Sequence, residues 1–203
     1  MDYPAPSGSP PEPGGWFMVL CSPDGKDPDS HGPVWVAAAE QAATVSPEQV
    51  AQMARRQLRL PAPVISASPS GTQLVRLPTW LWLSGGWAPS SATASVPGVS
   101  MTASATPLSV TWSMGDGISV TCPGPGTPYQ DVADPESASP DCGHTYVRSS
   151  AGEPRQAFVV SVTVLWTVTW NGAGQTGTFP DLTTTGSTAF RVAESHALNN
   201  GTR

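Results

Sequence analysis

Residues 158–170, FVVSVTVLWTVTW, decide the fold of this chain because apolar and polar side chains alternate along them. Successive side chains of a β-strand point to opposite faces, so the alternation predicts a long strand that is buried on one side. The buried side is expected to consist of Phe158, Val160, Val162, Val164, Trp166, Val168 and Trp170. The opposite side carries hydroxyl groups on Ser161, Thr163, Thr167 and Thr169.

Further strand candidates surround this segment, and turn residues separate them. Pro78 lies inside one candidate, and because proline lacks an N–H donor, that segment is expected to be an edge strand or to change sheets midway. The loop NGAGQTG at 171–177 predicts a hairpin turn. No helical pattern is interleaved, which favours a mainly β, antiparallel sandwich over a parallel α/β sheet. The candidates are 74–83, 99–106, 109–114, 178–183 and 187–192.

Two short segments carry a family resemblance: VTWSMGDG at 110–117 and CGHTY at 142–146. They resemble the PKD domain, whose hallmark is a tryptophan and Gly-Asp-Gly followed by a His-x-Tyr strand. The resemblance covers residues 92–193 and implies an immunoglobulin-like antiparallel β-sandwich. The matching positions are Trp112, Gly115, Asp116, Gly117, His144 and Tyr146.

The chemistry of these residues fits the maintenance of a fold. Trp112 is a large apolar body suited to the gap between two sheets, and its N–H is expected to need an acceptor. The glycines permit the positive φ of a tight turn, and Asp116 between them can accept bonds from turn amides. His144 and Tyr146 lie two apart on a strand, so their polar ends are expected to tie the opposite loop from one face.

A second resemblance concerns location. The chain is similar to small exported actinobacterial proteins of unassigned function that share the segments LPTWLWL and GDG…CGHTY, over residues 58–198. This resemblance implies an extracellular or envelope-associated protein, and it supplies no activity. A signal peptide is not present in the given sequence, because Met1 is followed by Asp-Tyr-Pro-Ala-Pro instead of a basic and then apolar leader.

The cysteines are consistent with an oxidising compartment. Cys122 and Cys142 bracket a loop rich in proline, glycine and aspartate between two strand candidates, and a disulfide between them is expected. Closing that loop would contribute about 3 kcal/mol in the loop-closure description. Cys21 is left over, which leaves a missing partner, a free thiol or an intermolecular disulfide as alternatives.

The N-terminal part differs from the sandwich in composition. Residues 1–15 are mostly proline, glycine and serine, and they are expected to form a disordered lead. Residues 16–60 are expected to form a small hairpin and one short helix, residues 61–196 the sandwich, and residues 197–203 a polar tail.

One helix is expected after Ser46, which can cap it, with Pro47 in the first turn and Gln49 completing a capping box. Its apolar stripe is expected to be Val50, Met53, Ala54 and Leu58. A helix this short is unstable alone in water, so the stripe must dock on the hairpin or on the sandwich.

Several classes of function lack support in the sequence. The net charge is −6 with only nine lysines and arginines, which argues against nucleic-acid binding. No apolar run is long enough for a transmembrane segment. The spacing G-x-G-x-x-G at 172–177 precedes a β or turn segment instead of a helix, so it indicates a hairpin tip and no dinucleotide site.

Catalytic and metal sites are not expected either. The histidines are His31, His144 and His196, and none adjoins a nucleophile in a recognisable motif. The acidic loop with Asp24, Asp27 and Asp29 lacks the EF-hand spacing, so it predicts a solvated loop. We expect no enzyme activity, no metal and no cofactor.

Three tryptophans offer a candidate binding platform. Trp80 and Trp82 alternate onto one face and Trp87 follows a Gly-Gly turn, so the three could stack on a glycan or a protein. The sequence favours packing of these tryptophans beneath the N-terminal helix and hairpin, because the helix needs an apolar surface and this one is adjacent in sequence. The sequence thus favours a non-enzymatic extracytoplasmic module for protein–protein contacts, with strand addition along 74–83 as one route. The alternative function is a carbohydrate-binding accessory module, so the partner is an unknown protein or a cell-wall glycan.

Overall fold

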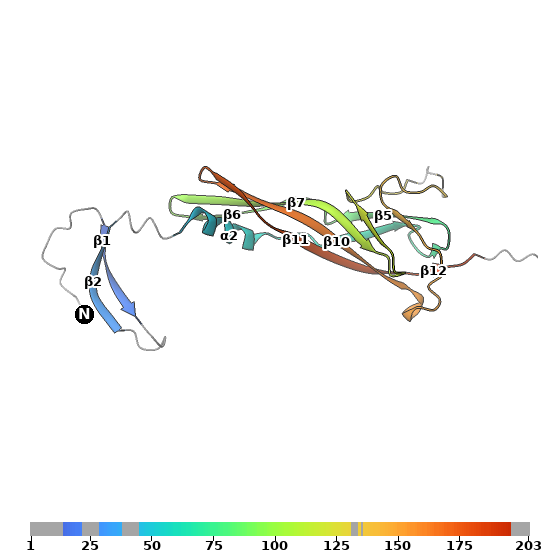
Figure 1. The fold of residues 1–203 in the computed structure, drawn as a ribbon, viewed down its shortest axis with the longest axis horizontal. Coiled ribbons are helices and arrows are strands. Elements are labelled where there is room, and N and C mark those ends of the chain that lie inside the picture. Colours follow the sequence, from blue (N-terminus) through green and yellow to red (C-terminus); the bar gives the residue numbers. More distant parts are fainter. Residues whose placement is uncertain (1–13, 22–28, 38–44, 131–133, 135, 196–203) are drawn as a thin grey trace, which may run out of the picture.

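The structure is a computed structural model, and it describes residues 14–21, 29–37, 45–130, 134 and 136–195. Figure 1 shows long antiparallel strands running side by side through most of this region, with one helix near one end. The protein is therefore mainly β, as its sequence predicts, with one α-helix and an N-terminal hairpin among the described residues. Most of the predicted lead and the whole predicted tail, together with Asp24, Asp27 and His196, lie outside the described residues.

The long sheet is built around the segment that the sequence identifies. Its strands β6 (Ser90–Val96), β7 (Val99–Ser113), β10 (Phe158–Gly172) and β11 (Gln175–Phe190) lie in the order β11-β10-β7-β6. Strand β8 (Ser119–Cys122) continues the sheet along β7. Every pairing in this sheet is antiparallel.

Two of the expected strand pairs are single strands in the structure. β7 runs unbroken from 99 to 113, because its pairing with β10 continues past Pro107 through a shift in register. A bulge accommodates a residue that lacks an N–H donor, so the proline does not stop the strand. β11 likewise joins 178–183 and most of 187–192. A two-residue turn, Ala173-Gly174 with φ of 44° and 73°, connects it to β10.

The short sheet consists of β3 (Val64–Ser68), β5 (Pro78–Gly85) and β9 (Gly143–Thr145), with β5 in the middle. Both sides of β5 are therefore occupied by backbone partners. Beyond the end of β9, the N–H of Leu81 donates to the carbonyl of Cys142 at 3.0 Å. The prediction of a free edge along 74–83 is wrong, because β3 and β9 cover the two edges of β5.

The same segment does change sheets, which was the other predicted outcome for a strand containing proline. Strand β4 (Gln73–Leu74) pairs in parallel with β12 (Val192–Ala193) near the C-terminal end of the described chain. Arg76, with φ of 67°, then turns the backbone, and Pro78 is the first residue of β5. Proline at the first position of a strand removes no ladder bond from its interior.

The main core lies between the two sheets. The inward positions of β10 are buried as predicted from Phe158 to Val168, and Trp170 is half-buried. Trp112 from β7 is fully buried beside them. Leu81 and Leu83 from β5 close the core from the short sheet. A 3-10 turn, Pro154–Gln156, precedes β10.

The helix α2 (Pro47–Gln57) covers the part of the long sheet that the short sheet does not reach (Figure 1). Its predicted capping box is present: the N–H of Gln49 donates to Ser46 Oγ, and the N–H of Ser46 donates to the Gln49 side chain. Val50, Ala51 and Ala54 are buried against β6 and β7. Ala51 takes the place predicted for Met53, which is 41% exposed.

The N-terminal hairpin consists of β1 (Gly14–Cys21) and β2 (Asp29–Ala37), which pair antiparallel with each other. Strand β1 begins at Gly14, inside the predicted lead 1–15 and two residues before the segment 16–60 in which the hairpin was expected. The rings of Trp16 and Trp35 pack edge to face across the pair at 5.3 Å. The helix docks on the long sheet, which was one of the two docking surfaces expected for it.

Candidate functional site

The Gly-Asp-Gly segment forms the tight turn that follows β7. Gly115 and Gly117 have φ of 77° and 101°, a region that glycine enters without strain. A Cβ on Gly115 would lie 2.7 Å from the carbonyl oxygen of Val159, so β10 also requires glycine there. The Asp116 side chain accepts a bond from the N–H of Ile118 at 3.0 Å. The positive φ of the two glycines and the bond to Asp116 are as predicted from the sequence.

His144 and Tyr146 tie β9 and the residue after it to this turn, as expected from their two-residue spacing. His144 Nε2 lies 2.8 Å from Asp116 Oδ2, and both side chains are less than 10% exposed. The Tyr146 hydroxyl donates to the carbonyl of Met114 at 3.1 Å. The phenol also stacks on Phe158, with ring centres 5.3 Å apart. The arrangement joins the short sheet to the end of the long one.

The environment of Tyr146 favours its neutral form. Burial raises the pKa of the Tyr146 phenol well above its ordinary value, and the nearby Asp116 carboxylate raises that pKa further. A phenol held in its protonated state can keep donating to the Met114 carbonyl. The contacts of Asp116, His144 and Tyr146 therefore stabilise the turn after β7, and the Asp116 carboxylate and the His144 imidazole are hydrogen-bonded to each other. Within the described residues, no group of three potential metal ligands occurs.

Trp112 fills the space between the sheets, as predicted, and is fully buried. Its indole N–H, which we expected to find an acceptor, has no hydrogen-bond partner among the described residues. Packing against the surrounding apolar side chains is therefore what holds this ring.

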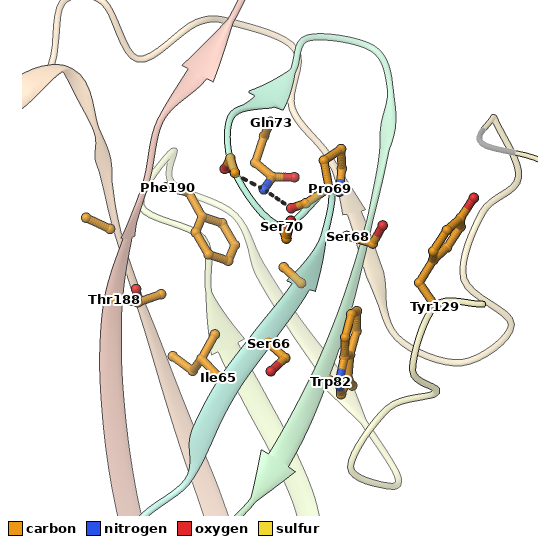
Figure 2. Close-up of a pocket in the computed structure, with 13 residues that line it drawn as sticks. Ile65, Ser66, Ser68, Pro69, Ser70, Gln73, Trp82, Tyr129, Thr188 and Phe190 are labelled. Carbon is orange, nitrogen blue, oxygen red and sulfur yellow. Dashed lines mark hydrogen bonds between the residues drawn. The ribbon is translucent and has the colours of Figure 1, made fainter. Parts of the chain in front are cut away.

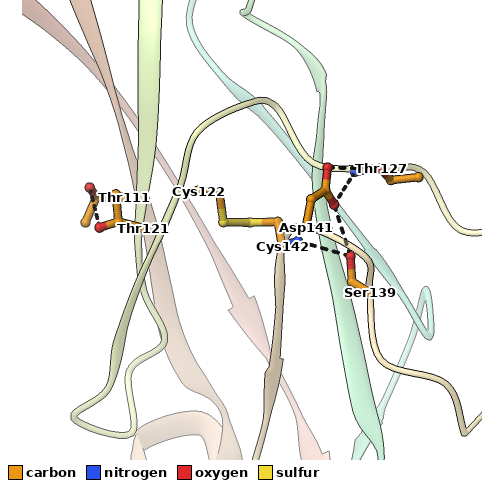
Figure 3. Close-up of a disulfide and its surroundings, with 7 residues drawn as sticks. All are labelled: Thr111, Thr121, Cys122, Thr127, Ser139, Asp141 and Cys142. Carbon is orange, nitrogen blue, oxygen red and sulfur yellow. Dashed lines mark hydrogen bonds between the residues drawn. A yellow bond between two sulfur atoms is a disulfide. The ribbon is translucent and has the colours of Figure 1, made fainter.

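The predicted disulfide is present. Cys122, at the end of β8, is bonded to Cys142, which directly precedes β9, so the bridge joins the two sheets (Figure 3). Asp141 fixes the enclosed loop by accepting from the N–H and the hydroxyl of Thr127 at 3.0 and 2.9 Å. Ser139 donates to Asp141 and accepts from the N–H of Cys142. The side chain of Cys21 lies outside the described part of the chain.

The three tryptophans do not form one exposed platform. Trp80 is 8% exposed, its indole N–H donates to the carbonyl of Ser137, and Tyr129 packs edge-on against it at 5.2 Å. The disulfide-closed loop, and not the helix and hairpin, therefore covers it. Trp87 is half-buried and packs against the main core. Trp82 is half-buried and lines a groove on the outside of the short sheet.

This groove, of about 530 Å³, runs along β3 and is the candidate binding site. Figure 2 shows β3 rising away from β11, with Ile65 on the side of Thr188 and Phe190 and with Ser66 on the side of Trp82. The turn after β3 closes one end, where the side chain of Gln73 donates to the carbonyl of Pro69 at 2.7 Å. None of the residues that line the groove is charged.

Sequence reasoning found only Trp82 among the groove residues. The groove combines β3, the turn after it, and the last residues of β11, which lie more than 110 positions further along the chain. The start of β3 and strand β11 approach closely near Gly186, where a Cβ would lie 2.7 Å from the carbonyl oxygen of Pro63. No local pattern reports that contact, because it depends on how the two sheets are stacked.

Comparisons with protein-family models, with curated proteins and with solved structures found no match. The resemblance to the PKD domain therefore stays a prediction from the motif. No helix among the described residues is both long and apolar enough to cross a membrane.

Proposed function

We propose that this protein is a non-enzymatic binding module that works outside the cytoplasm through protein–protein contacts. Its partner is a polypeptide in extended conformation that adds as a strand to β3. The observation that carries the proposal is the position of β3: it pairs with β5 on one side, and its other side borders the groove. The intramolecular disulfide supports an oxidising compartment.

An edge strand offers N–H and C=O groups for pairing, and a peptide that occupies them gains main-chain hydrogen bonds. β3 also offers different surroundings on its two faces. Ile65 faces Thr188 and Phe190, whereas Ser66 faces Trp82 (Figure 2). Because alternate side chains of an added strand point to opposite faces, these surroundings would select apolar residues at one parity and polar or aromatic residues at the other.

The test uses peptides selected from a random nine-residue library on the full, disulfide-bonded protein. Strand addition needs alternate main-chain N–H groups of the peptide. N-methylation at one set of alternate residues should therefore abolish binding, and N-methylation at the other set should leave it intact. Equal tolerance of both sets would contradict strand addition, as would the failure of the library to yield any binder.

A matched pair of variants locates the site. Thr188→Arg places a long side chain in the groove, and we expect it to weaken the selected peptides at least tenfold. Thr183→Arg is the control, since it lies on the same strand and does not line the groove. Equal weakening by both variants would place the peptide elsewhere.

Binding of a carbohydrate in the same groove is a second candidate function. Trp82 supplies an aromatic face and Ser66 and Ser68 supply hydroxyl groups, which is the combination that sugars use. This candidate has less support than strand addition, because Trp80 and Trp87 are taken up by contacts within the protein. Loss of polysaccharide binding in Trp82→Ala would favour it.

A further inference from the structure

Hydroxyl groups predominate on the outer face of the long sheet, where β10 has Val159 and Leu165 as apolar exceptions, and we call it the hydroxyl face. Strand register places Thr185, Thr163, Thr111 and Thr121 side by side across β11, β10, β7 and β8. The next row, two residues further along, is made of serines only. The rows are spaced by about 6.7 Å along the strands, and hydroxyl groups within a row by about 4.8 Å. The serine row consists of Ser187, Ser161, Ser113 and Ser119.

Some hydroxyl groups on this face are hydrogen-bonded to each other across neighbouring strands. Thr111 Oγ1 lies 3.2 Å from Thr121 Oγ1 in the first row (Figure 3). The face continues onto β6, where Thr93 Oγ1 lies 2.8 Å from Thr102 Oγ1 of β7. Such pairs limit side-chain rotation, so a ligand that uses the remaining lone pairs and protons meets a partly ordered array.

The second observation is the near absence of charge. The five strands of the long sheet contain a single charged side chain, Asp181, which lies in β11 where the register against β10 shifts. Exposed sheets in soluble proteins usually carry charges of both signs, which oppose association. Charges are present elsewhere in this chain, which has a net charge of −6. Their exclusion from this face indicates a constraint beyond solubility.

The chemistry of the face decides between classes of partner. Nucleic acids and anionic polymers need cations, and the face carries none. Protein interfaces depend on buried aromatic, arginine or apolar anchors, of which the two rows have none. A hydroxyl group is both donor and acceptor, so an array of them is complementary to another uncharged array of hydroxyl groups. A neutral polysaccharide is such an array, and its repeating units allow many weak contacts to act together.

We propose that the hydroxyl face binds a neutral polysaccharide, with the rows of threonine and serine hydrogen-bonding to its hydroxyl groups. The site is distinct from the groove along β3. The groove is lined by the short sheet and the end of β11, whereas the two rows lie across the outer face of the long sheet. The proposal does not depend on strand addition at β3. The protein would then hold a polymer on one face while a polypeptide occupies the groove.

The experiment measures depletion of the full, disulfide-bonded protein from solution by three insoluble neutral polymers: cellulose, chitin and granular starch. We expect at least one of them to retain the protein, with little change in 1 M salt because no ion pair is involved. Failure of all three to deplete the protein, or release by salt, would overturn the proposal.

A double variant, Thr111→Val with Thr163→Val, removes two hydroxyl groups and keeps the shape and the β-branching of the side chains. Two lost hydrogen bonds should weaken retention about tenfold. The control, Thr111→Ser with Thr163→Ser, keeps the hydroxyl groups and should retain binding within about threefold of the parent. An unchanged melting temperature shows that the variants are folded.

A further variant distinguishes polysaccharide binding at the hydroxyl face from binding in the groove. Trp82→Ala should leave polysaccharide retention unchanged, since Trp82 belongs to the short sheet. If Trp82→Ala removes retention and the double valine variant does not, the polymer binds the groove and the proposal is wrong. Retention of the double valine variant that equals or exceeds that of the parent would also overturn the proposal, because non-specific hydrophobic adsorption would then explain the binding.

Discussion

The two faces of the long sheet come from the same strands and have opposite chemistry. On β7, Trp112 is fully buried, whereas Thr111 beside it is exposed. On β10, Val162 is buried next to an exposed Ser161. The inner face packs against the short sheet and the helix, and the outer face carries hydroxyl groups with almost no charge. The alternation within a strand therefore assigns stability to one face and leaves the other free for recognition.

The two faces also differ in how well they tolerate substitutions. Apolar residues between the layers are close-packed, so a change in side-chain volume there disturbs the packing of the surrounding core residues. Residues on the outer face contact mainly their cross-strand neighbours and solvent, so most changes there have small effects on stability. If the outer face is a binding surface, its substitutions should change binding while the fold persists.

The largest effect is expected for Trp112→Ala. Removing a buried indole leaves a cavity between the sheets, and we expect a loss of about 3–5 kcal/mol in the free energy of unfolding. Thr111→Ala, one residue away on the other face, should cost no more than about 1 kcal/mol. Denaturation in urea measures both. Equal losses in the two variants would mean that the two faces do not differ in packing.

The next effect concerns the bridge between the layers. Cys122 points into the core at the end of β8, and its bond to Cys142 closes a loop with a sequence separation of 20 residues. Replacing both cysteines by serine should lower the free energy of unfolding by about 3 kcal/mol. Reduction of the native protein provides an independent comparison. A loss far below this value in both experiments would show that the bonds of Asp141 close the loop without the bridge.

A smaller effect is expected at the end of the core, where Tyr146 meets the turn after β7. Tyr146→Phe removes the bond to the Met114 carbonyl and should cost about 1 kcal/mol. Because the pKa of the Tyr146 phenol is raised in the folded state, the folded protein holds this proton more tightly than the unfolded chain does. The contribution of the protonated Tyr146 phenol to folding stability is complete below the ordinary tyrosine pKa near 10, and it is lost as the pH rises above that value.

The pH dependence of unfolding provides the measurement for this tyrosine. Stability of the parent protein should decline above pH 10, and the decline should be shallower in Tyr146→Phe. Tyr129, whose ring packs against Trp80, is the comparison position, since Tyr129→Phe keeps that ring contact. An identical alkaline decline in the parent and in Tyr146→Phe would contradict the assignment.

The smallest effect on stability is expected on the hydroxyl face itself. Thr163→Val keeps a β-branched side chain in the centre of β10, and we expect a change within about 0.5 kcal/mol. Thermal unfolding is the measurement. A loss of more than about 1 kcal/mol would show that the hydroxyl group is part of the fold and would weaken its interpretation as part of a binding surface.

Several elements of the fold could be predicted because their signals are local. The alternation along β10, the capping box at Ser46 and the turn at Gly115–Gly117 each depend on residues that are neighbours in sequence. The pairing of Cys122 with Cys142 was also predictable, since both bracket one loop. The two-residue spacing of His144 and Tyr146 predicted that both would tie an opposite loop, whereas their partners, Asp116 and the Met114 carbonyl, lie 28 and 32 residues away in sequence.

Other features required the arrangement of segments that are distant in sequence. The proline in 74–83 left an edge strand and a change of sheet as alternatives, and the position of β5 between β3 and β9 excluded the first. Trp80 was covered by a loop that the sequence placed more than 40 residues away. The candidate groove was missed because β11 contributes one of its walls.

The sequence by itself determined which face of β10 is apolar, where the helix begins and which cysteines pair, because side-chain periodicity and short loops are properties of neighbouring residues. Only the tertiary structure decided which strands lie side by side, which tryptophans are covered, and that the hydroxyl groups of β11, β10, β7 and β8 fall into rows. Register between distant strands depends on packing of the whole core, and no single segment encodes it.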